Sequence, residues 1–128
     1  MKAAVIQTLT NAKGTPVNQV ARSLARVNNS IVNIRTANQK AGSKYWFDVT
    51  PSFYSSVHFF IFACGTPSTV YVFPTVDLKQ LLVGASLGGQ KQVPNFTIFS
   101  NTNELEPAGS GGIRKSIVQY LNAFALIP

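Results

Sequence analysis

Side chains that bind metals or act as nucleophiles are scarce in this 128-residue sequence. It contains one histidine, His58, one cysteine, Cys64, and four acidic residues. A zinc site needs several histidine, cysteine or carboxylate ligands, which one His and one Cys do not supply. Both residues lie on one predicted strand, six positions apart, which separates them by about 20 Å. A regular strand therefore excludes a Cys–His catalytic pair, and we expect a partly buried histidine and a buried cysteine.

The four carboxylates do not form the cluster that a magnesium site requires. The close acidic pair, Glu104 and Glu106, lies in a predicted loop flanked by glycine and proline. Asp77 and Lys79 spell an acid–x–lysine string, but Asp77 also suits the first turn of a helix, where an acid is favourable. We therefore expect a chain without a cofactor. An alternative is a Mg²⁺-dependent nuclease that uses Asp48 or Asp77 with Lys79.

The charge balance indicates a polyanionic partner. Eleven lysines and arginines stand against four acids, which gives a net charge of +7. Nucleic acid is the commonest polyanion for a small basic domain, and an anionic membrane surface comes next. The sequence is 45% apolar and only 12% charged, which favours a folded domain over a disordered chain.

The segment over residues 35–44, RTANQKAGSK, is the strongest candidate for a binding feature. Its cations suit phosphates, and the amides of Asn38 and Gln39 suit phosphates or base edges. Tyr45 and Trp46 follow directly and would stack on bases if they are exposed. The predicted nucleic-acid-binding residues are Arg22, Arg26, Arg35, Asn38, Gln39, Lys40, Lys44, Arg114 and Lys115.

Five strands and up to three helices are expected to position these residues. Hydrophobic patterning predicts strands over residues 30–37, 45–49, 57–63, 70–73 and 93–99. The first two would form a hairpin, the next two would be adjacent and buried, and the last would lie at an edge because Pro94 cannot donate to a ladder. Helices are predicted over 15–29, from Thr75 onwards and over 113–127, while residues 2–10 fit a helix or a strand.

This element order predicts a single α+β domain over residues 1–128. Its core would be a mixed or antiparallel sheet of about five strands, flanked by two or three helices. We find no signal peptide and no apolar run of about 18 residues, so we expect a cytoplasmic protein without membrane insertion. The generous apolar content is compatible with a homo-oligomer.

Four pieces of the sequence resemble restriction-endonuclease-like domains of the PD-(D/E)XK superfamily. VNIRT, YWFDV, VHFFIFA and VYVFP, the last followed by TVDLKQLL, match that family's order of strands and short helix. The resemblance implies a nuclease site with a carboxylate, then a second acid two residues before a lysine, that bind Mg²⁺ and activate water. Here Asn33 stands at the acid position and Arg35 at the lysine position. Because arginine stays protonated, the resemblance implies a copy that does not cleave.

We therefore predict a non-catalytic nucleic-acid-binding module, with DNA favoured over RNA. Binding of RNA or single strands through the aromatic residues is a variant of the same hypothesis. A third alternative is a protein-interaction or accessory subunit, whose contact surface would be Trp46, Phe53 and Tyr54 if these residues are uncovered.

Overall fold

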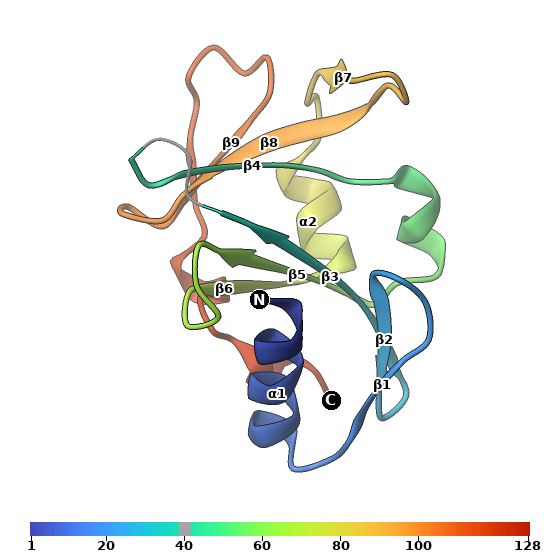
Figure 1. Ribbon diagram of the computed structural model, residues 1–128. Coiled ribbons are helices and arrows are strands. Elements are labelled where there is room, and N and C mark those ends of the chain that lie inside the picture. The colour runs from blue at the N-terminus through green and yellow to red at the C-terminus, as the bar shows by residue number, and fades with distance from the viewer. Residues whose placement is uncertain (39–41) are drawn as a thin grey trace.

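Within residues 1–38 and 42–128, which the computed structural model describes, the chain forms two α-helices and two five-stranded sheets (Figure 1). This arrangement confirms the predicted α+β class. Of the five predicted strands, residues 30–37, 57–63 and 70–73 contribute to one sheet, and residues 45–49 and 93–99 contribute to the other. None of the described helices has the length and apolar character needed to cross a membrane.

The first sheet, called sheet A, is mixed. It contains β1 (Val17–Gln19), β2 (Leu24–Val27), β3 (Ser30–Ala37), β5 (Phe59–Cys64) and β6 (Val70–Pro74), in the order β1-β2-β3-β5-β6. β3 and β5 are parallel, and the other neighbours are antiparallel. The predicted pairing of two adjacent buried strands is confirmed for β5 and β6, and every residue of β5 is buried, but β6 is the last strand of sheet A and not a central one.

Helix α1 (Lys2–Lys13) covers one face of sheet A (Figure 1). It ends at Gly14, whose φ of 64° is a left-handed conformation that glycine adopts without a Cβ penalty. Val5 and Leu9 lie one helical turn apart and are fully buried in a cluster that includes Val32 of β3. Residues 2–10 are therefore helical, which settles the ambiguity in the sequence.

The second sheet, called sheet B, is antiparallel. It contains β4 (Lys44–Asp48), β7 (Leu87–Gly88), β8 (Val93–Phe99), β9 (Glu104–Pro107) and β10 (Lys115–Ser116). The strand order is β10-β9-β8-β4, and β7 pairs with the start of β8. Among the described strands β4 pairs only with β8, so β4 is an edge strand.

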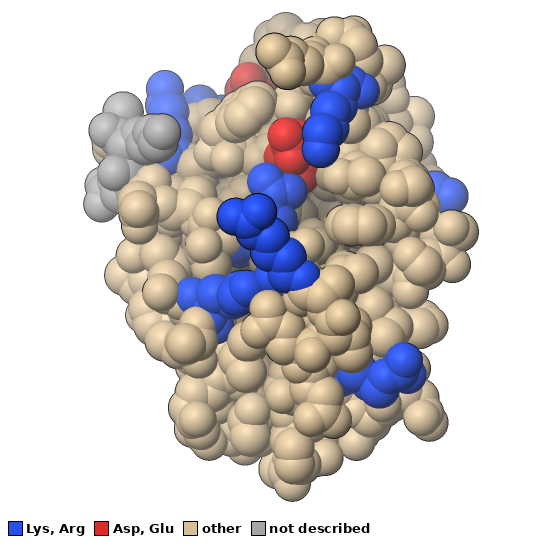
Figure 2. Space-filling model, turned by 45° about the vertical axis from the view of Figure 1, so that its right-hand side comes forward, with Lys and Arg blue, Asp and Glu red and all other residues tan. Residues whose placement is uncertain are grey.

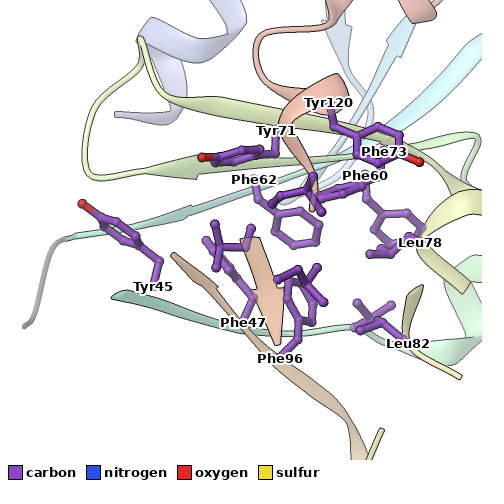
Figure 3. Packing of buried hydrophobic residues seen from close by; sticks show 14 of the residues in the cluster. Tyr45, Phe47, Phe60, Phe62, Tyr71, Phe73, Leu78, Leu82, Phe96 and Tyr120 are labelled. Atoms are coloured by element: carbon purple, nitrogen blue, oxygen red, sulfur yellow. The ribbon is translucent and has the colours of Figure 1, made fainter. Parts of the chain in front are cut away.

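A layer of aromatic side chains joins the two sheets (Figure 3). Phe62 of β5 lies at its centre, with ring centroids 4.7 Å from Phe47, 5.2 Å from Phe96 and 5.9 Å from Phe73. Phe47 and Phe96 come from sheet B, so the rings of both sheets interlock. Truncation of a buried phenylalanine typically costs about 3–5 kcal/mol, and this layer therefore fixes how the sheets face each other.

Short helical turns and the C-terminal segment complete the fold. Helix α2 (Thr75–Leu81) buries Leu78 in the aromatic layer, and 3₁₀ turns lie at Pro51–Ser55, Val118–Tyr120 and Phe124–Leu126. Asn122 covers the outer edge of β6. Its backbone N–H donates to the Val70 carbonyl at 2.6 Å, and its side-chain oxygen accepts from the Val70 N–H at 3.1 Å.

The chain passes four times between the sheets. It leaves sheet A after β3, returns after β4, leaves again after β6 through α2, and returns from β10 to the edge of β6. As a consequence, β3 and its parallel neighbour β5 are separated in sequence by a strand of the other sheet.

The predicted helix over residues 15–29 is wrong, because β1 and β2 form a hairpin there. The apolar residues fit helical spacing, but β2 also alternates between buried Ala25 and Val27 and exposed Arg26. Pairing of β2 with β3 satisfies its backbone groups and buries this face. Asn28, with φ of 53°, makes the tight turn into β3.

The predicted hairpin between residues 30–37 and 45–49 is also wrong. Both strands exist, but β3 pairs with β2 on one side and β5 on the other. With both edges of β3 occupied, β4 pairs with β8 in the other sheet.

The expected edge position of residues 93–99 is wrong as well. β8 pairs with β4 on one side and with β9 on the other. Pro94 is tolerated because its carbonyl accepts from the Val49 N–H at 3.1 Å, and this contact needs no donor from the proline.

The predicted helix over residues 113–127 does not form. The segment contains β10 and two 3₁₀ turns. Ile113, at an inward-facing position of the predicted helix, is 63% exposed, and Asn122 has a φ of 50° that a helix does not allow. The preceding stretch, predicted as a loop, contains β9.

Candidate functional site

A polar cleft of about 390 Å³ opens where sheets A and B diverge. It is lined by Ser23, Asn33, Arg35, Asp48, Thr50, Phe53, Lys91 and Val93. β3 supplies Asn33 and Arg35, the end of β4 supplies Asp48, and the turn before β8 supplies Lys91. The cleft therefore depends on both sheets.

Strand alternation explains why Arg35 faces this cleft. Successive side chains of β3 point to opposite faces of sheet A. Val32 and Ile34 join the cluster under α1, so Asn33 and Arg35 belong to the face that meets sheet B. In the register, Arg35 lies beside Phe62 of β5. The cleft is thus the polar margin of the aromatic layer.

Arg35 is held by Asp48. Its Nη1 donates to the carboxylate Oδ1 of Asp48 at 3.1 Å and to the Asp48 carbonyl at 3.3 Å. Both side chains are about a third exposed, so solvent screens the pair and we expect it to contribute less than about 1 kcal/mol. A guanidinium carries five N–H donors, and these two contacts use only one nitrogen. The other donors can bind a further acceptor, such as a phosphate oxygen.

Asn33 fixes the turn between β1 and β2 against β3. It is 3% exposed, and its amide nitrogen donates to the Ser23 hydroxyl at 3.1 Å and to the Ser23 carbonyl at 3.3 Å. The Ile34 N–H donates to the same carbonyl at 2.8 Å. These bonds hold Ser23 at the cleft, and its neighbour Arg22 accepts at its carbonyl from Lys2 of α1 at 2.6 Å.

Lys91 also lines the cleft, and Arg22 and Arg26 lie on the β1–β2 hairpin, whose turn residue Ser23 lines it. Arg22, Arg26 and Lys91 are exposed, and within the described part of the chain none of them forms an ion pair. Arg26 lies opposite Ile31 in the register, so it shares the face of sheet A that carries Asn33 and Arg35. Figure 2 shows a face of the molecule where Lys and Arg side chains run across the middle, with acidic atoms beside them.

The other acidic residues lie away from this cleft. Asp77 accepts a hydrogen bond from the Tyr120 hydroxyl at 2.8 Å. Glu104 and Glu106 lie on β9, 3.9 Å and 3.6 Å from Arg114. Among the residues that line the cleft, Asp48 alone opposes the two cations Arg35 and Lys91.

The structure separates the predicted nucleic-acid-binding residues into groups. Arg35 lines the cleft, Arg22 precedes its lining residue Ser23, and Arg26 lies on the same face of sheet A as Arg35. Lys44 and Arg114 belong to sheet B and its connections, and both lie against the ring of Phe99, at 5.8 Å and 3.7 Å from its centroid.

Lys115 and Asn38 are placed elsewhere. Lys115 donates to the Leu81 carbonyl at 2.9 Å and lines another cleft with Asp77. Asn38 is exposed at the end of β3, and Gln39 and Lys40 lie outside the described residues.

The residues of the nuclease alternative are not brought together. Asp48 lines the cleft between the sheets, whereas Asp77 lines the cleft with Lys115, and Lys79 lies over the ring of Tyr54. Across residues 1–38 and 42–128, no three His, Cys, Asp or Glu side chains are grouped so that they could hold a metal ion.

The histidine and the cysteine have separate environments. His58 is exposed, which corrects the expected partial burial, and its Nδ1 accepts from the Ile31 N–H at 2.8 Å. Cys64 is buried in the aromatic layer, as predicted, and burial raises its thiol pKa to about 12. A thiol in this state is protonated at neutral pH and is a poor nucleophile.

The aromatic residues proposed for a partner surface are covered to different extents. Trp46 is 60% exposed, whereas Phe53 and Tyr54 are half-buried against the aromatic layer. Tyr45, the other candidate for stacking, is buried in that layer.

Sequence reasoning misses Ser23, Thr50 and Lys91. Lys91 is an isolated cation in a glycine- and glutamine-rich turn, far in sequence from the other cleft residues. Lys91 reaches the cleft only because β8 pairs with β4, which brings the turn before β8 to this position.

Comparisons of this chain with family models, curated proteins and solved structures found no match. The resemblance to restriction-endonuclease-like domains stays a prediction. Asn33 and Arg35, which stand at that family's acid and lysine positions, both line the cleft. A functional assignment therefore rests on the residues themselves.

Proposed function

We propose that this protein is a non-catalytic nucleic-acid-binding module, with DNA as the favoured ligand, that holds the phosphate backbone at the cleft between its sheets. The observation that carries the proposal is the group of cations at this cleft. Arg35 and Lys91 line it, Arg22 precedes its lining residue Ser23, and Arg26 shares the face of sheet A that carries Arg35. Against these four positive charges the cleft presents one carboxylate, that of Asp48.

The spacing of the cations suits a backbone that crosses the face. Arg26 lies opposite Ile31, which is four residues from Arg35 along β3. Four residues of strand span about 13 Å, and one strand of duplex DNA carries about one phosphate charge per 3.4 Å of helix axis. A single bound strand can therefore contact both arginines.

The chemistry of the cleft supports binding without cleavage. Arg35 stays protonated and does not exchange protons as a lysine can. Asn33 is neutral, and both of its donor contacts go to Ser23. These residues suit the fixed positioning of a phosphate and of the loop that carries Arg22.

Binding to a labelled DNA duplex by fluorescence anisotropy, at two salt concentrations, tests the proposal. Arg35→Gln, Arg26→Gln and Lys91→Gln should each weaken binding and reduce the salt slope by about one. Lys13→Gln is the matched control, because Lys13 ends α1 on the opposite face of sheet A and donates to the Ile127 carbonyl. It should bind like the parent protein.

Two results would overturn the proposal. The first is no binding by the parent protein at low salt. The second is an equal loss of affinity for Lys13→Gln and for the cleft variants. A gel of the DNA after incubation with Mg²⁺ tests the non-catalytic part, since cut DNA would favour the nuclease alternative instead.

A further inference from the structure

We infer that the bound nucleic acid is single-stranded and that Trp46 stacks on one of its bases. The inference rests on the proposed function and extends it to a strand type and to a residue outside the cleft. It concerns the face of β4 opposite to Tyr45 and Phe47, on the edge strand of sheet B.

Strand alternation sets Trp46 apart from its neighbours. Tyr45 and Phe47 point into the aromatic layer and are 6% and 2% exposed, whereas Trp46 is 60% exposed. Its partner on the next strand is Thr97, a small side chain that leaves the indole uncovered. A ring that is uncovered in this way is available to stack on a base.

The indole lies next to the phosphate-binding cleft. Asp48, which holds Arg35, is two residues from Trp46 on the same face of β4. Two residues of strand span about 7 Å. A backbone held at Arg35 therefore brings an unpaired base within reach of the indole.

One cation lies directly beside the indole. Lys44 is exposed two residues before Trp46 on the same face. Glu104 and Glu106 lie on β9, with β8 between them and β4, and Arg114 lies 3.9 Å and 3.6 Å from their carboxylates. Arg114 therefore offsets one of the two acidic charges, and Thr97 of β8 separates Glu106 from the indole.

The strand type follows from access to the base. In a duplex, both faces of each base are covered by neighbouring bases, and an aromatic side chain on a sheet reaches them only after unstacking. Bases of a single strand are free to stack on aromatic side chains with little dependence on sequence. The exposed indole thus selects single strands, while the cleft cations bind phosphates of either form.

Trp46 is the single tryptophan of the chain, so its fluorescence reports directly on this site. We expect an oligothymidine strand to quench the emission and to protect it from acrylamide, and a hairpin duplex of equal charge to do neither. Trp46→Ala should weaken binding of the strand about tenfold and leave duplex binding unchanged. Trp46→Phe, which keeps a ring, should retain most of the affinity.

The outcomes separate this inference from the proposed function. The inference would be overturned if Trp46→Ala kept the single-strand affinity of the parent protein and the strand did not quench the tryptophan emission. If Arg35→Gln still lost binding in that case, the proposed function would stand. No binding of either DNA by the parent protein would overturn both. Circular dichroism should show that Trp46→Ala is folded, and the quenching of the parent protein does not depend on any variant.

Discussion

At the scale of single residues, the carboxylate of Asp48 lowers the net positive charge of the cleft. Its ion pair with Arg35 is partly exposed, so its loss should affect stability little. Asp48→Asn removes one negative charge and keeps an oxygen that can accept from Arg35. We expect tighter DNA binding, with a salt slope that increases by about one, measured by anisotropy at several salt concentrations.

Asp77→Asn is the control for this substitution, because it makes the same charge change in a different cleft. Its salt slope should stay close to that of the parent protein. Weaker binding by Asp48→Asn would show instead that the carboxylate is needed to orient Arg35.

Cys64 should be unreactive in the folded protein. It is 2% exposed, and burial raises its pKa to about 12, so almost no thiolate forms at pH 8. A chromogenic disulfide reagent should label it slowly in buffer and within seconds in guanidinium chloride. Rapid labelling under native conditions would show that the layer around Cys64 opens readily.

At the scale of elements, the turn after β5 couples the two sheets. Gly65 has a φ of 78°, and a Cβ there would lie 2.5 Å from the hydroxyl oxygen of Tyr45 on β4. A non-glycine residue in a left-handed conformation costs about 1–2 kcal/mol. Gly65→Ala should therefore lower the free energy of unfolding by more than this amount, as measured by urea unfolding.

Gly84→Ala provides the comparison, because Gly84 has a φ of 81° and a methyl group added at its Cα would meet nothing within 4 Å. It should show the conformational cost alone. Tyr45→Phe removes the hydroxyl and should recover part of the stability of Gly65→Ala. Equal losses for the two alanine variants would mean that Tyr45 moves aside freely.

The elements that the sequence predicts correctly are those whose pattern has one physical solution. The apolar runs of β5 and β6 and the alternation of β3 suit strands, and the structure has them. Residues 15–29 and 113–127 carry apolar residues at helical spacing that can also be buried by turns and short strands. Tertiary pairing decides between the solutions, as it does for Val27 in β2.

The cleft can be predicted only in part for a related reason. Arg35 stands out because it lies in a basic segment, and Arg22 and Arg26 stand out because of the overall charge. Lys91 and Ser23 enter through contacts between segments far apart in sequence. Local sequence patterns do not determine which strand joins which sheet. The residues that contact Arg35 therefore cannot be predicted from those patterns.

At the scale of the whole molecule, a buried thiol and a buried phenol make the stability of the fold depend on pH in the alkaline range. Burial raises the pKa of Cys64 from 9.0 to about 12. Burial, and then the charges of Cys64 and Tyr45, raise the pKa of Tyr71 from 10.0 to about 12. Above pH 9 the unfolded chain loses protons that the folded protein keeps, so stability falls as pH rises towards 12.

Chemical unfolding at pH 8, 9, 10 and 11 measures this dependence. Cys64→Ala, which lacks one of the two groups, should show a shallower fall than the parent protein. The difference between the two proteins should be constant below pH 8 and change only above it. A difference that is the same at every pH would contradict the assigned role of Cys64.

The four passages of the chain between the sheets have a consequence for cutting the molecule. A break in the turn at residues 89–92 would divide sheet B, because β4 and β7 would lie on the first fragment, with all of sheet A, and β8, β9 and β10 on the second. Phe47 and Phe62 would then be on one fragment and Phe96 on the other. Neither fragment would bury its aromatic rings alone, yet the two carry complementary surfaces. We expect them to fold only on meeting, which makes this protein a natural candidate for a split reporter whose halves signal that two attached proteins have come together.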